Sequence, residues 1–308
     1  MNRLRVRSDQ VVAKGRVRAC GLGHYLSDQP NLQKPHGDKL TFVLSLPDLI
    51  AHLGACRAVD LAQPYYTGIP HHPAHAPFLY GLNKKHGDYV NPGGASSASE
   101  AIAMGTHVGT HIDALCHFTC DGKLFGGEDA APVQNYPEGL KRHTVDTIAP
   151  MFRRGVLLDV PKARSVETLP EDFMIQPEHL EACGVPVQPG DVVLIRTGQA
   201  RYWDDPARFI SQVRSPGPGL DAAKWLSDRQ VFAAGSDTAP FEFAPSPEQA
   251  VHVHLLVRSG IHIIECLNLE ELSSLGATEF LFVAAPLKIR GGTGSPLRPY
   301  ALVVPANA

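Results

Sequence analysis

Short apolar runs that alternate with helical stretches constrain the fold of this 308-residue chain more than any other feature. Each run is β-branched or apolar and is bounded by turn residues, a pattern typical of buried strands. The predicted strands cover residues 58–61, 155–160, 192–197, 230–234, 261–266 and 280–289. Helices are predicted over residues 176–183, 221–229 and 247–259. We therefore expect one α/β or α+β domain built on a mixed sheet.

The helix predicted over 247–259 has marked signals at both ends. Ser246 is its expected N-cap, Pro247 its first helical residue, and Gln249 completes a capping box. Gly260 is the expected stop signal.

Residues 63–93 contain scattered Pro, His and Gly without periodicity. Long loops that could cover a site are therefore expected between residues 63 and 105.

Composition excludes several classes of protein. With 28 Lys and Arg against 31 Asp and Glu, the net charge of −3 gives no basic surface for nucleic acid. No apolar run approaches the roughly 18 residues of a membrane span, so neither nucleic acid nor a membrane is an expected partner. Six cysteines are too sparse for a disulfide framework and favour reduced thiols. We therefore expect a cytoplasmic protein.

Three imidazoles and one carboxylate lie within eleven residues, at His107, His111, Asp113 and His117. An isolated histidine is usually a hydrogen-bonded core or surface group. Four such groups at this density instead favour a metal site, since imidazole and carboxylate suit zinc, manganese or iron(II).

An extended path is expected through this cluster, because Gly109 and Thr110 are poor helix residues. His111 and Asp113 would then point to one face of a strand, with Ile112 on the other. His107 would come in from the bend at Gly109.

The predicted helix 247–259 carries two histidines that could supply a further metal ligand. At about 100° per residue, His252 falls inside the apolar arc and His254 falls outside it. His252 is thus the candidate for an inward-facing site, although a core histidine bonded to a carbonyl remains the alternative. Glu265 ends an otherwise buried strand, where a carboxylate needs a metal or a partner. His262 is expected on the opposite face.

These residues resemble a known family, the cyclase-like metal-dependent hydrolases that include kynurenine formamidases and isatin hydrolases. The family signature His-x-Gly-Thr-His-x-Asp-x-Pro-x-His matches residues 107–117, with Leu115 in place of Pro. Further likeness lies at 252–256, 260–265 and 292–299. One residue more separates His252 from Glu265 than in the formamidase pattern.

The resemblance implies a swivelling β/β/α fold over residues 58–308, preceded by an extension over 1–57, in a homodimer or homotetramer. It implies that His107, His111 and Asp113 bind a divalent ion, Zn²⁺ or Mn²⁺. Asp113 would bridge to a second ion held by His252 and Glu265, so that one or two ions bind. His117 would be the catalytic acid or base.

The expected function is metal-assisted hydrolysis of a carbon–nitrogen bond in a small cyclic amide or N-formyl amide. A metal-activated water would attack, and His117 would move its proton to the leaving nitrogen.

Two alternatives stay open. His111, Asp113 and His252 also form the two-histidine, one-carboxylate pattern of iron(II) oxygenases, with Arg258 or Arg298 available for an acidic cosubstrate. The other alternative is a non-enzymatic protein whose ion only braces its loops.

Overall fold

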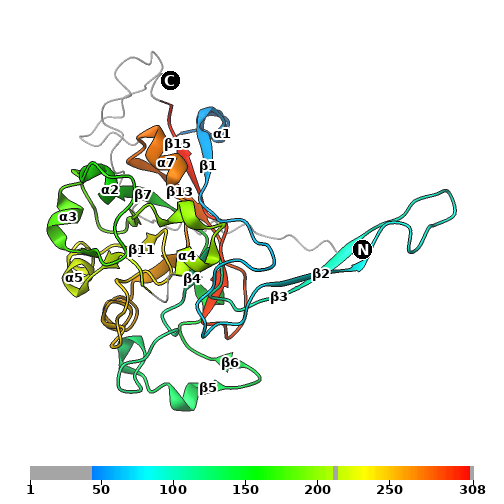
Figure 1. Ribbon diagram of the computed structural model, residues 1–308, viewed down its shortest axis with the longest axis horizontal. Helices are drawn as coiled ribbons and strands as arrows, with labels where there is room; N and C mark the ends of the chain where they lie inside the picture. The colour runs from blue at the N-terminus through cyan, green and yellow to red at the C-terminus, as the bar shows by residue number, and fades with distance from the viewer. Residues whose placement is uncertain (1–43, 211–213, 306–308) are drawn as a thin grey trace, which may run out of the picture. The chain divides into compact units, whose positions relative to one another are not determined.

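The computed structural model describes residues 44–210 and 214–305. The chain divides into two units, Met1–Leu49 and Ile50–Ala308. Helix α1 (Leu46–Ala55) crosses this boundary, and every other described helix and strand lies in the second unit (Figure 1). No helix in the described parts of the chain is long and apolar enough to cross a membrane.

A nine-stranded mixed sheet organises the second unit, in the order β1-β15-β13-β7-β9-β11-β12-β4-β14. The four neighbours β7, β9, β11 and β12 are parallel, and the remaining pairs are antiparallel. The strands are β1 (Arg57–Asp60), β4 (His111–Asp113), β7 (Met151–Asp159), β9 (Val192–Arg196), β11 (Ala233–Ser236), β12 (His262–Glu265), β13 (Glu279–Ala284), β14 (Gly294–Pro296) and β15 (Tyr300–Val303). This mixed α/β architecture confirms the expected fold class.

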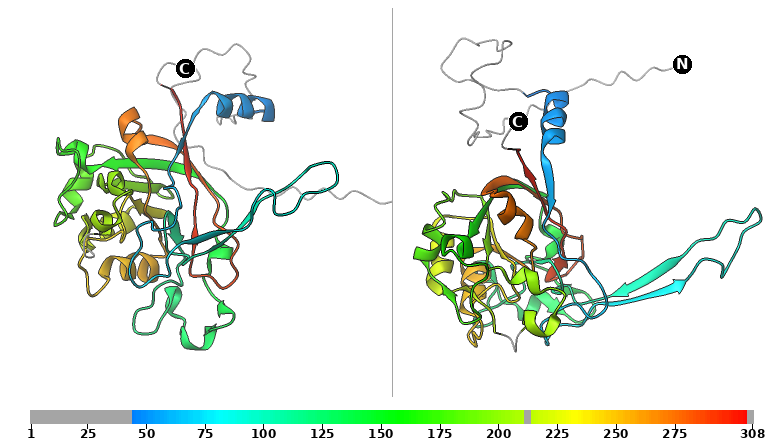
Figure 2. Two further views of the ribbon diagram at one scale, coloured as in Figure 1. Left: turned by 45° about the vertical axis from the view of Figure 1, so that its right-hand side comes forward. Right: turned by 45° about the horizontal axis from the view of Figure 1, so that its top comes forward.

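Short helices cover one face of the parallel part of the sheet (Figure 2). The described α-helices that lie wholly within the second unit are α2 (Val160–Ala163), α3 (Pro177–Glu181), α4 (Pro206–Ile210), α5 (Leu220–Asp228), α6 (Ala250–His252) and α7 (Glu270–Leu275), and the π-helix η6 (Val253–Ser259) follows α6. Three two-stranded ladders stand apart from the large sheet. They join β2 (Leu79–Lys84) to β3 (Ser99–Ala103), β5 (Gln134–Asn135) to β6 (Gly139–Leu140), and β8 (Met174–Ile175) to β10 (Gly217–Pro218).

Two cores lie on the two faces of the sheet, because side chains alternate along each strand. Ile263 belongs to the core under the helices, whereas Ile112 and Ile264 belong to the core on the opposite face. In the antiparallel pair β12–β4, Ile263 lies opposite Asp113 and Glu265 lies opposite His111. These two pairs therefore present their side chains on the helix-covered face.

The helix predicted from Pro247 begins later, at Ala250, so that the predicted start was wrong. The Ser246 hydroxyl donates to Glu242 Oε2 (2.6 Å) instead of capping the helix, and Gln249 is left-handed with a φ of 48°. Gly260 does end the helix, with a φ of 66°.

Residues 253–259 are π-helical, and a π turn holds more residues than an α turn. This π-helical segment lies between His252 and strand β12, which ends at Glu265.

Three strand predictions need correction. The strand predicted over 155–160 is β7, which begins four residues earlier, at Met151. The predicted strand 230–234 is β11, displaced toward Ser236, because Gln230 is left-handed with a φ of 53°. Gly235 lies inside that strand, where a Cβ would be 2.9 Å from Leu267 and 3.0 Å from Leu194. The prediction over 280–289 was too long, since β13 ends at Ala284, shortly before Pro286.

The long loops expected between residues 63 and 105 are interrupted by β2 and β3, which pair as an antiparallel ribbon. This ribbon projects from the rest of the second unit (Figure 2). Leu79 and Tyr80 are both exposed and point to opposite faces of the ribbon, so its apolar residues do not mark one buried face of a strand.

Candidate metal centre

Strand β4 presents two of the predicted ligands together. His111 and Asp113 are buried on its helix-covered face, and Ile112 is fully buried in the opposite core, as the extended path predicts. The bend before β4 depends on Gly109, whose φ is 67° and whose position leaves no room for a Cβ beside the Tyr65 ring. The Tyr65 hydroxyl lies 2.7 Å from the Thr110 carbonyl oxygen and holds this bend.

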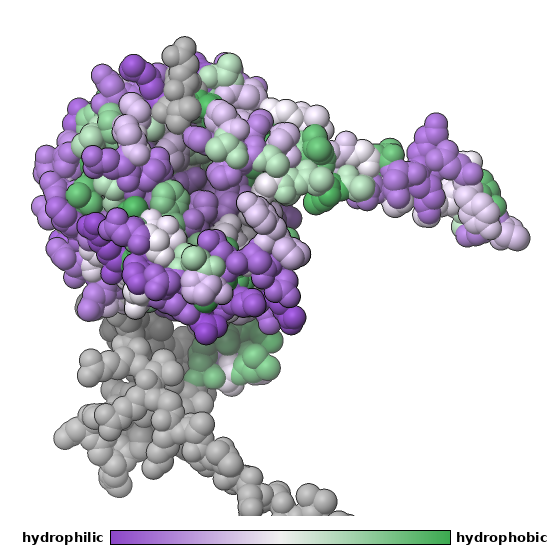
Figure 3. Space-filling model, turned by 90° about the horizontal axis from the view of Figure 1, so that it is seen from below, coloured by the Kyte–Doolittle hydropathy of each residue, from purple (hydrophilic) through white to green (hydrophobic). Residues whose placement is uncertain are grey.

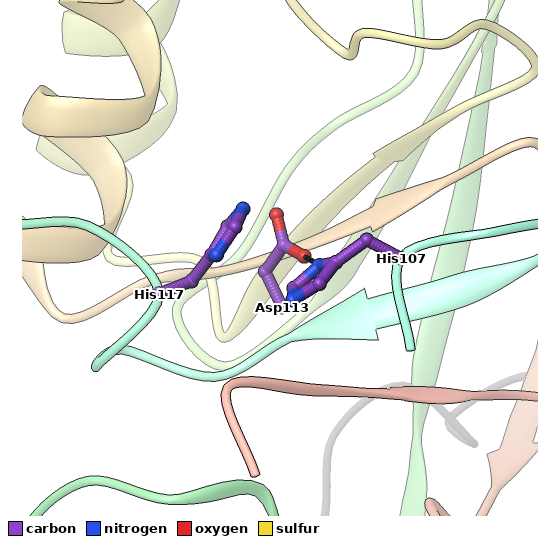
Figure 4. A group of neighbouring side chains, drawn as sticks. All are labelled: His107, Asp113 and His117. Carbon is purple, nitrogen blue, oxygen red and sulfur yellow. Dashed lines mark hydrogen bonds and ion pairs between the residues drawn. The ribbon is translucent and has the colours of Figure 1, made fainter. Parts of the chain in front are cut away.

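His107 comes from the turn before β4 and His117 from the loop after it (Figure 4). His107 Nδ1 donates to Asp113 Oδ1 at 2.7 Å, and the Thr293 hydroxyl lies 2.8 Å from His107 Nε2. One potential ligand atom each from His107, Asp113 and His117 lies within 4.8 Å of the other two.

A second group shares Asp113 and adds His252 and Glu265, again with ligand atoms within 4.8 Å of one another. His252 Nε2 lies 3.2 Å from Glu265 Oε1 and 3.9 Å from Asp113 Oδ2. The backbone N–H of Phe241 donates to Glu265 Oε1 at 2.7 Å and fixes that carboxylate. Asp113 thus belongs to both groups, as a bridging ligand would.

His111 lies between the two groups. Its Nδ1 donates to the Gly109 carbonyl at 2.8 Å, which leaves the Nε2 lone pair facing inward. Nε2 is 3.5 Å from Asp113 Oδ1 and 3.6 Å from Glu265 Oε2, too far for good hydrogen bonds. Two ligands of a tetrahedral ion with bonds of about 2.1 Å are roughly 3.4 Å apart, so these atoms fit a divalent metal.

Charge in this buried cluster also favours a cation. Burial opposes ionisation of Asp113, but the neighbouring His117, His107 and His111 lower the pKa of its carboxyl below the usual range. Burial likewise opposes ionisation of Glu265, and the hydrogen bond from His252 lowers its pKa. The His252 pKa rises to about 10 against burial, through Glu242 and Glu265. The proton on His252 Nε2 therefore occupies a place that a metal ion can take.

His117 and His75 are neutral at pH 7. Burial, opposed by Asp113 and reinforced by His107, lowers the His117 pKa to about 3. Burial and His107 lower the His75 pKa to about 4. The His75 ring stacks on His107 with centroids 5.3 Å apart.

Three residues at this centre were missed in the sequence. Glu242 accepts from His252 Nδ1 at 2.5 Å, but it lies outside the predicted helix that carries His252. Thr293 contacts His107 from a distant part of the chain. Thr293 lies in the family-like segment 292–299, which was the only available signal. His75 was one of several histidines in a segment without periodicity.

Two further histidines that the sequence analysis singled out, His254 and His262, lie outside the cluster. His254 Nε2 lies 2.9 Å from the Ser227 hydroxyl, on the side of the helix predicted to face away. His262 points to the opposite face of β12 from Glu265, and its Nδ1 donates to the Asp113 backbone carbonyl at 3.0 Å.

A cavity of about 450 Å³ opens beside the cluster. Its lining includes His117, Thr119, Gln134, Leu140 and Thr293. Because His117 and Thr293 belong to the cluster, a small molecule in this cavity would reach the candidate metal centre.

Comparison with known proteins identifies related chains. A family model described as a putative cyclase matches residues 59–242. The kynurenine formamidase of Bacillus cereus is 28% identical over 243 residues, which cover 78% of this chain and 94% of that protein. The isatin hydrolase of Roseibium aggregatum is 30% identical over 216 residues, covering 66% of this chain and 73% of that protein.

Solved structures show the same fold. A crystal structure of a novel cyclase has a TM-score of 0.75 and 26% identity, covering 84% of this chain and 92% of that one. Isatin hydrolase A from Ralstonia solanacearum has a TM-score of 0.66 and 28% identity, covering 86% and 99%. The resemblance found in the sequence is confirmed.

Proposed function

Because this chain belongs to the family of putative cyclases, we propose that it is a metal-dependent hydrolase that cleaves the carbon–nitrogen bond of a cyclic amide or an N-formyl amide. The convergence of histidines and carboxylates on Asp113, beside an open cavity, is the observation that supports it. The related enzymes are named for a formamide and for isatin, which is a cyclic amide.

The proposed ligands of the first ion are His107, His111 and Asp113, and those of a second ion are Asp113, His252 and Glu265. Nitrogen and oxygen donors of this kind suit Zn²⁺ or Mn²⁺. A bound divalent ion would lower the pKa of a coordinated water toward about 7 and polarise the substrate carbonyl.

The chain itself supplies proton transfer and positioning. A neutral His117 can accept the proton of the attacking water on a ring nitrogen and return it to the leaving nitrogen. Thr293 holds the His107 ring, and Glu242 holds the His252 ring through Nδ1. Hydrogen bonds of this kind set the ring orientation and the basicity of metal-binding histidines.

The two alternatives receive less support. An oxygenase would leave His107 and His117 without a role, and Arg298 is paired with Asp60 at 2.8 Å rather than directed at the cluster. A purely structural ion needs no open cavity beside His117, whereas catalysis does.

The direct test combines metal analysis of the purified protein with anaerobic turnover of formamides, lactams and imides. We expect bound zinc or manganese, and release of a carboxylate and an amine-type product without oxygen or 2-oxoglutarate. A strict oxygen requirement would establish the oxygenase alternative instead. Bound metal with no turnover of any amide would favour the structural role.

The proposed assembly is a homodimer or homotetramer joined through the β2–β3 ribbon. Tyr80 lies opposite Ile102, and Leu79 lies opposite Ala103, so that apolar side chains occupy both faces of the ribbon. Tyr80, Ile102 and Leu79 are each more than half exposed, and Figure 3 shows hydrophobic surface along the root of the ribbon. Isolated two-stranded ribbons are marginally stable in water. A reciprocal contact between two copies would cover both ribbons at once.

Light scattering tests this assembly. The double substitution Tyr80→Ser and Ile102→Ser should convert the oligomer into a folded monomer. Phe152→Ser, which removes an even more exposed ring from the large sheet, is the matched control and should leave the mass unchanged. A wild-type monomer, or an oligomer insensitive to the ribbon substitutions, would contradict this assembly.

The proposed location is the cytoplasm. The cysteines described by the structure, at positions 56, 116, 120, 183 and 266, are free thiols, which a reducing compartment preserves. Cell fractionation with thiol titration of the recovered protein tests this location.

A further inference from the structure

A second cavity, of about 190 Å³, lies behind the segment that carries Asp113 and His117. His262, which lines it, points to the opposite face of β12 from Glu265, so the cavity and the metal centre are on different faces of the sheet. Its apolar walls include Leu115, Met151 and Phe232.

Arg153 is the only Arg or Lys side chain among the residues that line this cavity. Its guanidinium lies 3.6 Å from the centroid of the Phe232 ring, and Nη1 donates to the Gly190 carbonyl at 3.3 Å. These two contacts hold the planar guanidinium group in place. Five N–H groups in a rigid fork match the two oxygens of a carboxylate.

Arg153 has no carboxylate partner among the residues that the structure describes. Its neighbour Arg154 pairs with both Asp191 and Glu279, the latter at 2.9 Å. Burial lowers the pKa of Arg153, and no nearby carboxylate offsets this. A half-buried cation without a counterion is costly, and a bound anion would remove that cost.

We propose that this cavity binds a small organic anion, a carboxylate joined to a compact apolar group, with Arg153 holding the carboxylate. The apolar walls formed by Leu115, Met151 and Phe232 favour an organic anion over inorganic phosphate. The site is separate from the proposed substrate cavity, which is lined by Cys116 and His117.

The cavity is physically connected to the catalytic segment. Leu115, which stands where the family signature has Pro, lines it, whereas the next two residues line the substrate cavity. His262 contributes to its wall and donates to the backbone carbonyl of Asp113. A ligand in this cavity would therefore contact the back of the segment that presents Asp113 and His117.

Calorimetric titration of the metal-loaded protein with benzoate tests the site. Arg153→Gln should weaken benzoate binding at least tenfold, because a charge-assisted hydrogen bond is lost. Arg164→Gln is the matched control, since Arg164 also stacks on a phenylalanine ring, Phe173, at 4.4 Å but lies outside the cavity. Its affinity should stay within twofold of wild type.

A second variant covers the case in which Arg153→Gln does not fold. Ala149→Trp adds a large ring at an exposed residue of the lining and should also weaken benzoate tenfold or more. Benzyl alcohol and inorganic phosphate should each bind the wild type at least tenfold more weakly than benzoate.

Failure of benzoate to bind the wild type would overturn the proposal. So would equal benzoate affinity in the wild type, Arg153→Gln and Ala149→Trp, because the carboxylate would then lie at the metal centre. Phosphate binding tighter than benzoate would show a simple anion site and would also overturn it.

Discussion

The rings of His107 and His117 stack almost parallel, with centroids 3.8 Å apart and an angle of 19° between their planes. His107 contacts Asp113 through Nδ1 and Thr293 through Nε2. His117 shares the stack without the same bonds and lines the neighbouring cavity. This relationship suits the roles proposed above, His107 as a metal ligand and His117 as the group that moves a proton.

His117→Ala should lower kcat by about 10²–10⁴ while the protein keeps its metal and much of its substrate affinity, because general acid–base catalysis contributes about that factor. Metal content and kcat are measured on one preparation. Because a ligand atom of His117 also lies near Asp113 and His107, loss of metal together with activity would make His117 a ligand instead. An unchanged rate would exclude both roles.

His111→Ala should release the metal, because His111 Nε2 faces Asp113 and Glu265 at ligand-like separations. Alanine at His107 or Asp113 should have the same effect. Metal analysis after gel filtration measures the stoichiometry, and full retention by His111→Ala would show that this residue is no ligand.

His252→Gln should strongly reduce turnover, whereas His254→Gln should be nearly silent. The two residues lie on one helical segment, but His252 contacts Glu265 and His254 contacts Ser227. Steady-state kinetics of the two variants makes the comparison. A larger loss of turnover in His254→Gln than in His252→Gln would show that the face carrying His252 is not the one at the site.

Glu242→Gln should weaken binding of the second ion about 10–100-fold, since a carboxylate that accepts from Nδ1 sets the orientation and basicity of His252. Competition with a chelator measures the affinity. Glu279→Gln removes a half-exposed carboxylate elsewhere in the sheet and serves as the control. Equal affinities in the two variants would leave Glu242 with only a structural role.

As the pH falls from about 8 to about 5, the thermal stability of His254→Gln should decrease less than that of the wild type. Burial and the positive charges of Arg258 and Lys224 lower the His254 pKa below 6.5. The unfolded chain therefore binds more protons as pH falls through 6.5, and stability falls with it. Melting temperatures of the metal-free proteins across this range measure the effect, and parallel pH curves for wild type and variant would contradict it.

The spacing of residues along the chain was enough to predict part of the site. His111 and Asp113 lie on one face because a strand alternates with a period of two, and Gly109 permits the bend that brings in His107. The inward position of His252 followed from helical angle alone. Their roles as ligands, and that of His117 in catalysis, stay predictions.

Other predictions failed where a competing contact, or the lack of a core, overrode the pattern in the sequence. The Ser246 hydroxyl was expected to cap a helix, but Glu242 accepts its hydrogen bond and the helix begins later. The β2–β3 ribbon escaped detection because its apolar residues lie on both exposed faces. A period of two in hydrophobicity marks a strand face that packs against the core of the same chain. The ribbon has no such face.

The alternation of strands and helices, the family and the dense cluster between His107 and His117 can all be read from the order of the amino acids. The pairing of β12 with β4, which places Glu265 opposite His111, is visible only in the folded chain. The folded chain also gives Arg153 contacts with Gly190 and Phe232 but, among the described residues, no carboxylate. Pairing across a sheet depends on the competition among all strands for neighbours, and no local spacing in the chain encodes it.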